Sequence, residues 1–245
     1  MLHRTLASRD HRPEVADSFA MEAASNMHTC YYRSGYDISL PLDPETVFPE
    51  LADIDPLDRK YFATVKGSVY LNGHGSEERM SLVPLLDEAN GVIVSMHCHE
   101  HPDKLALPDD FAFCADLEEQ YESHDYRSLM NTTFAIVPAG RSVGTYRLAE
   151  VMSAGAIPVF VARDIVRPFR EQFDWTTFSL VFAPDQVGPS MIKTLRAISP
   201  EDLKEMQRKS LKAYKEIFGL GTGDFDVIAR HMVHILKDRI GHHRR

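Results

Sequence analysis

Residues 134–162 place an apolar segment, a glycine-containing loop, a helical pattern and a second apolar segment in direct succession. The apolar segments read FAIVPA and IPVFVA, the loop reads GRSVG, and TYRLAEVMSAGA lies between the loop and the second segment. Short buried strands that alternate with helices are typical of a parallel sheet covered by helices on both faces. The sequence therefore predicts an α/β fold with a Rossmann-like, doubly wound parallel sheet.

The rest of the chain repeats this alternation. Two C-terminal helices have clear signals: Ser199 begins an N-cap pattern before residues 200–218, and residues 224–240 place Phe225, Ile228, Met232 and Ile235 on one face. We expect further strands over residues 60–71, 91–96 and 178–184, and helices over residues 76–89, despite Pro84, and 125–133.

Charge and hydropathy exclude some classes of protein. A formal net charge of −9 argues against general affinity for a nucleic acid backbone, which requires clustered Lys and Arg. The sequence has no run of about 18 apolar residues, the length expected of a membrane span. Its N-terminal residues also lack the apolar core of a secretory signal.

The loop after the predicted strand FAIVPA is a candidate anion site. Ligands of doubly wound sheets bind beyond the carboxyl ends of the strands. Gly140 and Gly144 permit close backbone approach and positive φ, and Thr145 can cap the following helix, whose N-terminus favours an anion. Arg141 adds a planar donor fork suited to phosphate.

Arg147 and Glu150 follow this loop at a spacing of three residues. At that spacing they can pair with each other or jointly face the cleft. A carboxylate one or two turns from a phosphate site is well placed to accept both hydroxyls of a ribose. The alternative is a solvated ion pair beside a glycine turn, and the spacing by itself leaves both open.

Residues 134–180, which continue through VARDIVRPFREQFDWTTFSL, resemble the donor-site core of the exostosin glycosyltransferase family. Three outlying segments resemble further parts of the family pattern: YRSGYDISLPL, RKYFATVKGSVYLNGHGSEER and DYRSLMNTTFAIVP. The resemblance covers about residues 28–185. Ala139 departs from it, because the family often carries an arginine there, and so does Ser68, where some relatives place a basic residue. The pocket therefore holds less positive charge than in those relatives.

The resemblance implies a glycosyltransferase of the GT-B type, with two facing Rossmann-like domains. Such an enzyme moves a sugar from a nucleotide sugar, with UDP as the expected carrier, to a glycan or glycoprotein acceptor with inversion. Residues 1–57 would be a remnant of the N-terminal acceptor-side domain, 58–220 the nucleotide-sugar domain, and 221–245 a C-terminal helix and tail.

The resemblance also implies roles for individual residues. Glu150 would hold the ribose, and the diphosphate would be held by Gly140, Arg141, Ser142, Gly144, Thr145 and Arg147. No cofactor or metal is expected, because helix dipole and arginine neutralise the departing diphosphate. The residues identify no catalytic base. Asp37 is the acid that matches a family motif, and we expect a structural role for it.

Cysteine pairing and location are linked. The three cysteines, Cys30, Cys98 and Cys114, are compatible with three buried thiols or with a Cys98–Cys114 bridge that closes a loop of about 15 residues. The family works in the lumen of the Golgi or endoplasmic reticulum, which favours the bridge and leaves Cys30 unpaired. The same location makes Asn131, in Asn-Thr-Thr, a predicted glycan acceptor.

Two other classes of function stay open. One is a binding module that holds a nucleotide or glycan without transferring sugar. The other is a zinc-dependent hydrolase, since the segment 97–101 contains zinc-ligand residue types: His97, Cys98, His99, Glu100 and His101.

Overall fold

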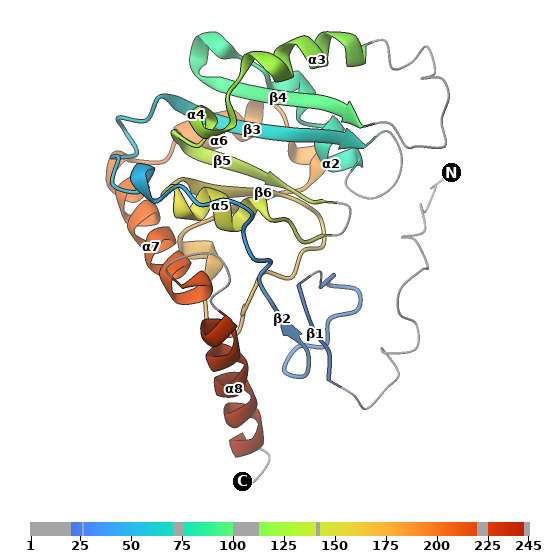
Figure 1. Ribbon diagram of the computed structural model, residues 1–245, viewed down its shortest axis with the longest axis vertical. Coiled ribbons are helices and arrows are strands. Elements are labelled where there is room, and N and C mark those ends of the chain that lie inside the picture. The colour runs from blue at the N-terminus through green and yellow to red at the C-terminus, as the bar shows by residue number, and fades with distance from the viewer. Residues whose placement is uncertain are drawn as a thin grey trace.

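The computed structural model describes residues 21–25, 27–70, 76–99, 113–140, 143–219 and 225–242. Its centre is a five-stranded sheet in which every neighbouring pair is parallel. The strands lie in the order β4-β3-β5-β6-β7 (Figure 1), and their bounds are β3 Tyr61–Tyr70, β4 Val92–His99, β5 Thr132–Pro138, β6 Ile157–Val161 and β7 Leu180–Phe182. The predicted parallel α/β sheet and its strands are confirmed.

Apolar side chains of the central strands point alternately to two cores, one on each face of the sheet. On β5, Ala135 and Val137 belong to one buried cluster, and Phe134 and Ile136 belong to the other. Such strands are buried on both faces and therefore have continuous apolar sequences. The sheet is doubly wound, as predicted.

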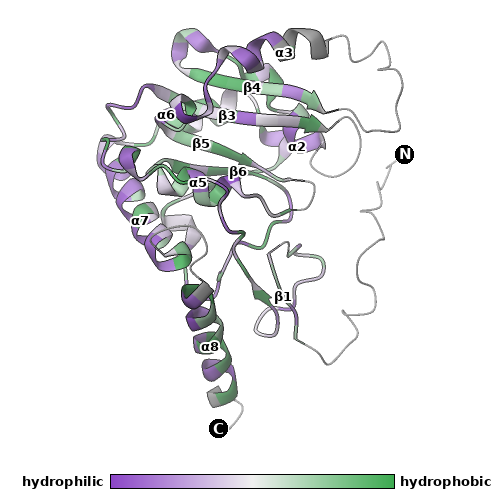
Figure 2. Cartoon of the chain, in the orientation of Figure 1, coloured by the Kyte–Doolittle hydropathy of each residue, from purple (hydrophilic) through white to green (hydrophobic). Residues whose placement is uncertain are grey.

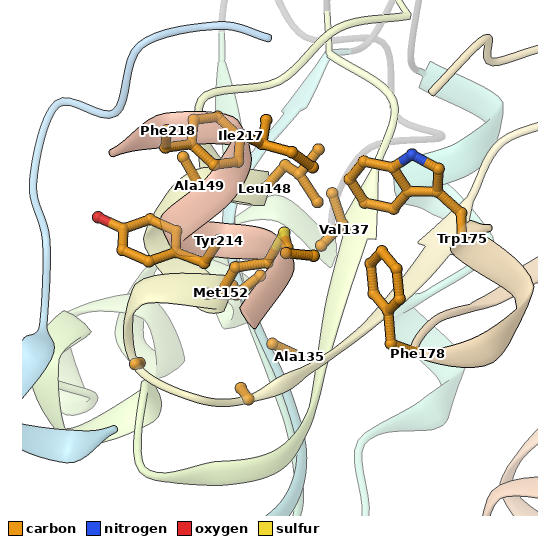
Figure 3. Packing of buried hydrophobic residues seen from close by; sticks show 14 of the residues in the cluster. Ala135, Val137, Leu148, Ala149, Met152, Trp175, Phe178, Tyr214, Ile217 and Phe218 are labelled. Atoms are coloured by element: carbon orange, nitrogen blue, oxygen red, sulfur yellow. The ribbon is translucent and has the colours of Figure 1, made fainter. Parts of the chain in front are cut away.

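The first core lies between the sheet and helices α5 (Arg147–Ser153) and α7 (Pro200–Phe218). Figure 3 shows Tyr214, Ile217 and Phe218 of α7 together with Leu148, Ala149 and Met152 of α5, with Trp175 to one side. The Trp175 ring is 2% exposed, and its Nε1–H donates to the Pro168 carbonyl oxygen at 2.9 Å. The second core receives Met191 and Leu195 from α6 (Pro189–Arg196).

The remaining helices and a small second sheet complete the described chain. A two-residue parallel pair joins β1 (Ala23–Ala24) to β2 (Ile38–Ser39). The remaining helices are α2 Ser76–Met80, α3 Phe113–Ser123, α4 Tyr126–Leu129 and α8 Phe225–His242, with 3-10 turns at Pro49–Leu51, Val83–Leu85, Glu88–Asn90, Trp175–Thr177 and Pro184–Gln186. Among the described residues no helix has the length and apolar character needed to cross a membrane.

The single helix predicted over residues 76–89 is wrong. The segment forms α2, then the 3-10 turns Val83–Leu85 and Glu88–Asn90. Pro84 has no N–H to donate and disfavours the helical conformation of the residue before it. Leu86 then has an extended ψ of 119°, which ends the first of these turns.

Helices α3 and α6 were not predicted. The described buried contacts of α3 come from Leu117 and Tyr121, and those of α6 come mainly from Met191 and Leu195. Each pair has the i, i+4 spacing of a helix, and the sequence adds Phe113 to the first set and Ile192 to the second, but segments this short give only a weak period.

Both C-terminal helices agree with their predicted signals. The Ser199 hydroxyl accepts from the Asp202 N–H at 3.1 Å, which is the predicted N-cap. On α8, Ile235 is buried and Ile228 and Met232 are partly buried; the side chain of Phe225 lies outside the description. Figure 2 shows hydrophilic and hydrophobic residues alternating along α7 and α8, as expected for helices with one covered face.

Residues 21–57 pack against the sheet domain at several points. Phe48 lies in the first core, and its N–H donates to the Ser153 hydroxyl of α5 at 2.9 Å. The Ser39 hydroxyl donates to the Val166 carbonyl oxygen at 2.7 Å. The boundaries predicted at residues 57/58 and 220/221 stay predictions.

Candidate functional site between strands β3 and β5

The candidate site lies where the central strands β3 and β5 part. Their register runs from Tyr61 opposite Thr132 to Thr64 opposite Ala135, and no later pair joins them among the described residues. Pairing of β3 with its other neighbour, β4, continues to Tyr70 and His99. After β4 the chain crosses back over β3, so β5 lies on the other side of β3 from β4. Doubly wound sheets bind ligands at such a switch in strand order, so we expect a ligand crevice at the carboxyl ends of β3 and β5.

Arg147 bridges the two strands at the level where their pairing ends. Its Nε–H donates to the Ile136 carbonyl oxygen of β5 at 2.8 Å, and its second terminal nitrogen, Nη2, donates to that of Thr64 in β3 at 3.3 Å. The residue is 7% exposed. A planar guanidinium with several fixed donors can satisfy carbonyl groups on both strands at once. The Arg147 side chain therefore extends from α5 to the carbonyl groups of the sheet.

Arg79 of α2 makes a second bridge closer to the carboxyl ends. Its Nη1 donates to the Ser68 carbonyl oxygen at 2.8 Å, and its Nε–H donates to that of Ala139 at 3.1 Å. Gly67 makes room for it, since a Cβ there would lie 2.9 Å from Nη1. Arg79 was not predicted as a site residue from the sequence. The available signal was an arginine in the first turns of a helix that follows a strand and a glycine-containing turn.

Tyr126 connects Arg147 to Glu150. Its hydroxyl donates to the Glu150 carboxylate and accepts from Nη1 of Arg147 at 3.3 Å. Glu150 is 6% exposed, so the solvated ion pair considered from the sequence is wrong. Burial raises the pKa of Glu150 even though Tyr126 and Arg147 favour its charged form. Burial also raises the pKa of Tyr126 to about 12.

The loop itself is fixed by contacts within the chain. A Cβ on Gly144 would lie 2.4 Å from the Ser25 carbonyl oxygen, so this glycine permits close approach of the chain's own backbone. It does not adopt the positive φ that a glycine permits. Close approach to an anion stays a prediction. The Thr145 hydroxyl accepts from the Arg147 N–H at 3.3 Å, a cap at the start of α5. Gly140 is buried. Arg141 and Ser142 lie outside the described residues.

Asp37 has the structural role expected of it. Its carboxylate accepts from the Glu22 N–H at 2.9 Å and from the Arg33 side chain at 2.7 and 2.9 Å. Burial alone would raise the pKa of Asp37, but the hydrogen bonds and charge of Arg33 outweigh it and hold this pKa below its usual value. Both oxygens are therefore occupied, and Asp37 lacks the exposure and basicity of a catalytic base.

The segment 97–101 gives no support to a zinc-dependent hydrolase. Cys98 is disulfide-bonded, so it supplies no thiolate. His97 is hydrogen-bonded through Nε2 to the Ser68 hydroxyl at 3.2 Å. Three buried thiols are also wrong as an interpretation, because Cys30 is exposed. The side chains of His99 and Cys114, and residues 100 and 101, lie outside the description, so the Cys98–Cys114 pairing stays a prediction.

Asn131, the predicted glycan acceptor, is half-buried at the start of β5. Its side-chain oxygen accepts from the Lys60 N–H at 3.2 Å. The Thr133 hydroxyl of the same tripeptide donates to the Pro56 carbonyl oxygen at 2.6 Å. The modification stays a prediction.

The sheet, its switch in strand order and the two buried arginines define a Rossmann-like α/β protein with positive charge where β3 and β5 part. The sequence matches the Exostosin GT47 domain over residues 1–198, and the chain belongs to this family. Exostosin-1 of Drosophila melanogaster is 30% identical over 209 residues, which cover 82% of this chain and 27% of that protein. The Exostosin-1 homolog of Caenorhabditis elegans is 28% identical over 240 residues, covering 94% of this chain and 61% of that protein.

The chain thus spans less than two thirds of the length of these relatives. Exostosin-1a of Danio rerio is also covered only in part: it is 28% identical over 91% of this chain and 31% of its own length. Among solved structures, the crystal structure of a GtfA/B complex aligns with 85% of this chain and 42% of its own chain, at 13% identity and a TM-score of 0.41.

Proposed function

We propose that this chain holds the donor site of a glycosyltransferase, which moves a sugar from a nucleotide sugar to a glycan or glycoprotein acceptor. The observation that carries the proposal is the pair of buried guanidinium groups, Arg79 and Arg147, at the crevice between β3 and β5. A doubly wound sheet binds nucleotides at this place. Membership of the exostosin family supplies the reaction class.

UDP is the proposed carrier. Its diphosphate would lie against the loop 139–146, with donors from Arg141, Ser142 and Thr145 and close backbone approach at Gly140 and Gly144. Arg147 acts from beneath by positioning the loop and α5, because its hydrogen bonds among the described residues go to the sheet and to Tyr126. Glu150 would accept from the ribose hydroxyls through lone pairs that Tyr126 leaves available.

The proposed reaction is displacement at the anomeric carbon. An acceptor hydroxyl attacks, the bond to the diphosphate oxygen breaks, and the sugar is transferred with inversion. Fixed positive charge near the departing diphosphate lowers the barrier because charge accumulates there in the transition state. We assign no catalytic base. The two-domain GT-B arrangement is part of the same proposal.

We also propose that the reaction takes place in the lumen of the Golgi or endoplasmic reticulum. A disulfide at Cys98 supports an oxidising compartment.

A transfer assay tests the proposal. The purified chain is incubated with a panel of UDP sugars and glycan acceptors, and released UDP and the extended acceptor are measured. Arg141→Ala should lower transfer at least about a hundredfold, as loss of a charged donor at a developing anion does. Arg208→Ala is the matched control, since this arginine is exposed on α7 and paired with Glu205.

The outcomes separate the functions under consideration. Extended acceptor that depends on Arg141 supports the transferase. Nucleotide binding without transfer supports the binding module instead. Neither binding nor transfer by a folded chain contradicts both.

A further inference from the structure

His28, Cys30 and Asp164 come together from two distant segments of the chain. His28 and Cys30 lie between β1 and β2, and Asp164 follows β6. His28 forms an antiparallel bridge with Ile165, and the Thr29 N–H donates to the Asp164 carbonyl oxygen at 3.0 Å. These backbone contacts fix the two segments side by side without help from the three side chains.

One ligand atom from each of these residues lies within 4.8 Å of the other two. His28 Nε2 and the Asp164 carboxylate are 3.4 Å apart. Bonds of about 2.0–2.3 Å to a shared ion put tetrahedral ligand atoms about 3.3–3.8 Å apart. The imidazole and the carboxylate therefore already have the separation that coordination requires, and the Cys30 thiol has to move by about 1 Å or less. Cys30 is free and exposed, so solvent ions reach it.

We propose that His28, Cys30 and Asp164 bind one divalent cation of the zinc class, with water as the remaining ligand. A thiolate, an imidazole and a carboxylate together suit zinc, whereas magnesium and calcium require oxygen ligands. The proposal is independent of the proposed transferase function.

A neighbouring hydrogen bond orients the Asp164 carboxylate. The Thr29 hydroxyl donates to Oδ1 of Asp164 at 2.9 Å and leaves Oδ2 facing His28. Contacts of this kind to ligating carboxylates typically strengthen metal binding. The Cys30 N–H donates to Nδ1 of His28 at 3.1 Å, so the neutral ring carries its proton on Nε2.

Binding rearranges two protons. The ion takes the place of the proton on Nε2 of His28, the ring is then protonated at Nδ1, and the hydrogen bond from the Cys30 N–H is lost. The Cys30 thiol loses its proton to solvent when its sulfur binds the ion. One proton is therefore released per ion bound.

The site lies at the same edge of the sheet as the loop 139–146. Asp164 comes shortly after the carboxyl end of β6, and Ser25, three residues before His28, touches Gly144. The three proposed ligands are nonetheless separate from the residues proposed for the donor.

Cobalt(II) titration of the full chain tests the proposal, because a cobalt–thiolate bond has a near-ultraviolet charge-transfer band. The expected result is one equivalent bound, with the band removed by added zinc and absent from Cys30→Ser. His28→Gln and Asp164→Asn should each weaken binding at least about tenfold. His234→Gln is the matched control: it removes an exposed histidine that pairs with Asp238 at 3.3 Å without a cysteine, and should change nothing.

Two results would overturn the proposal. One is the absence of the band from the wild-type chain. The other is a band that survives unchanged in both His28→Gln and Asp164→Asn, which indicates adventitious binding by a thiol. A second measurement needs no variant: zinc should slow alkylation of Cys30, followed by peptide mass spectrometry, at least about tenfold. An unchanged alkylation rate contradicts the site.

Discussion

The Nε–H of Arg79 donates to the carbonyl oxygen of Ala139 at 3.1 Å, so a side chain of α2 holds the first residue of the loop after β5. The same guanidinium holds the Ser68 carbonyl oxygen of β3. The position of the proposed diphosphate loop therefore depends on a helix that follows a different strand. In the family pattern an arginine often occupies the place of Ala139; here Arg79 brings a guanidinium to that residue from α2.

Arg79→Met keeps the aliphatic stem and removes the donors. The buried Ala139 carbonyl and the part-buried Ser68 carbonyl each lose a donor, which should lower the free energy of unfolding by about 1–3 kcal/mol. Displacement of the loop should weaken UDP binding at least about tenfold, measured by calorimetry beside a urea titration. Arg208→Met is the control, with both quantities expected to match wild type. Unchanged UDP affinity in a destabilised Arg79→Met would show that Arg79 supports the fold alone.

Gly144→Ala should destabilise the chain, because the new Cβ meets the Ser25 backbone oxygen at 2.4 Å. Relief requires movement of two backbone segments, at a cost of about 1–3 kcal/mol. Gly67→Ala is the matched comparison: its Cβ meets the end of the flexible Arg79 side chain at 2.9 Å, so it should cost less stability. Urea midpoints test the ranking. A Gly144→Ala variant as stable as wild type contradicts the packing of residues 25–42 on the loop.

Tyr126 should make stability fall with rising pH above about pH 10. Its pKa is raised by burial from 10.0 to about 12 in the folded chain. Between these values the unfolded chain loses a proton that the folded chain retains, so unfolding becomes easier by about 1.4 kcal/mol per pH unit. Tyr126→Phe should remove this part of the slope when urea midpoints are compared from pH 9 to pH 11. Equal slopes for the two chains would contradict the buried phenol.

Arg59→Met should stabilise the chain at neutral pH by about 1 kcal/mol, since apolar replacement of a buried charge is often stabilising. Arg59 is 9% exposed, and its three guanidinium nitrogens have no hydrogen-bond partner among the described residues. Burial lowers the pKa of Arg59 to about 10, which shows how poorly the charge is compensated. Thermal unfolding of the variant checks this. A clear loss of stability would mean that an interaction of the guanidinium is essential.

Strands β5 and β6 were predictable because each is buried on both faces and is therefore a continuous apolar run. Residues 157–161 show this most plainly, since every one of them is buried. The sequence also marked the loop after β5 as the position of interest. These features are local, so the sequence reveals them.

The arrangement around the loop was not predictable in the same way. Arg147 was expected to face an anion, but its hydrogen bonds go to carbonyl groups of two strands that are far apart in the sequence. The role of Arg79 depends equally on where Ala139 lies in space. Gly144 is matched to the backbone of Ser25, which precedes it by more than a hundred residues. Tertiary packing decides which groups Arg147, Arg79 and Gly144 contact, and no local sequence pattern encodes those contacts.

The first measurement to make is a calorimetric titration of the purified chain with UDP. A donor site between β3 and β5 should bind UDP with a dissociation constant of about 10–100 μM, equivalent to roughly 5.5–7 kcal/mol. Arg141→Ala and Glu150→Ala should each abolish measurable binding, while Arg208→Ala should bind as wild type does. A folded wild-type chain that binds no UDP, or variants that bind it unchanged, would contradict a donor site between β3 and β5.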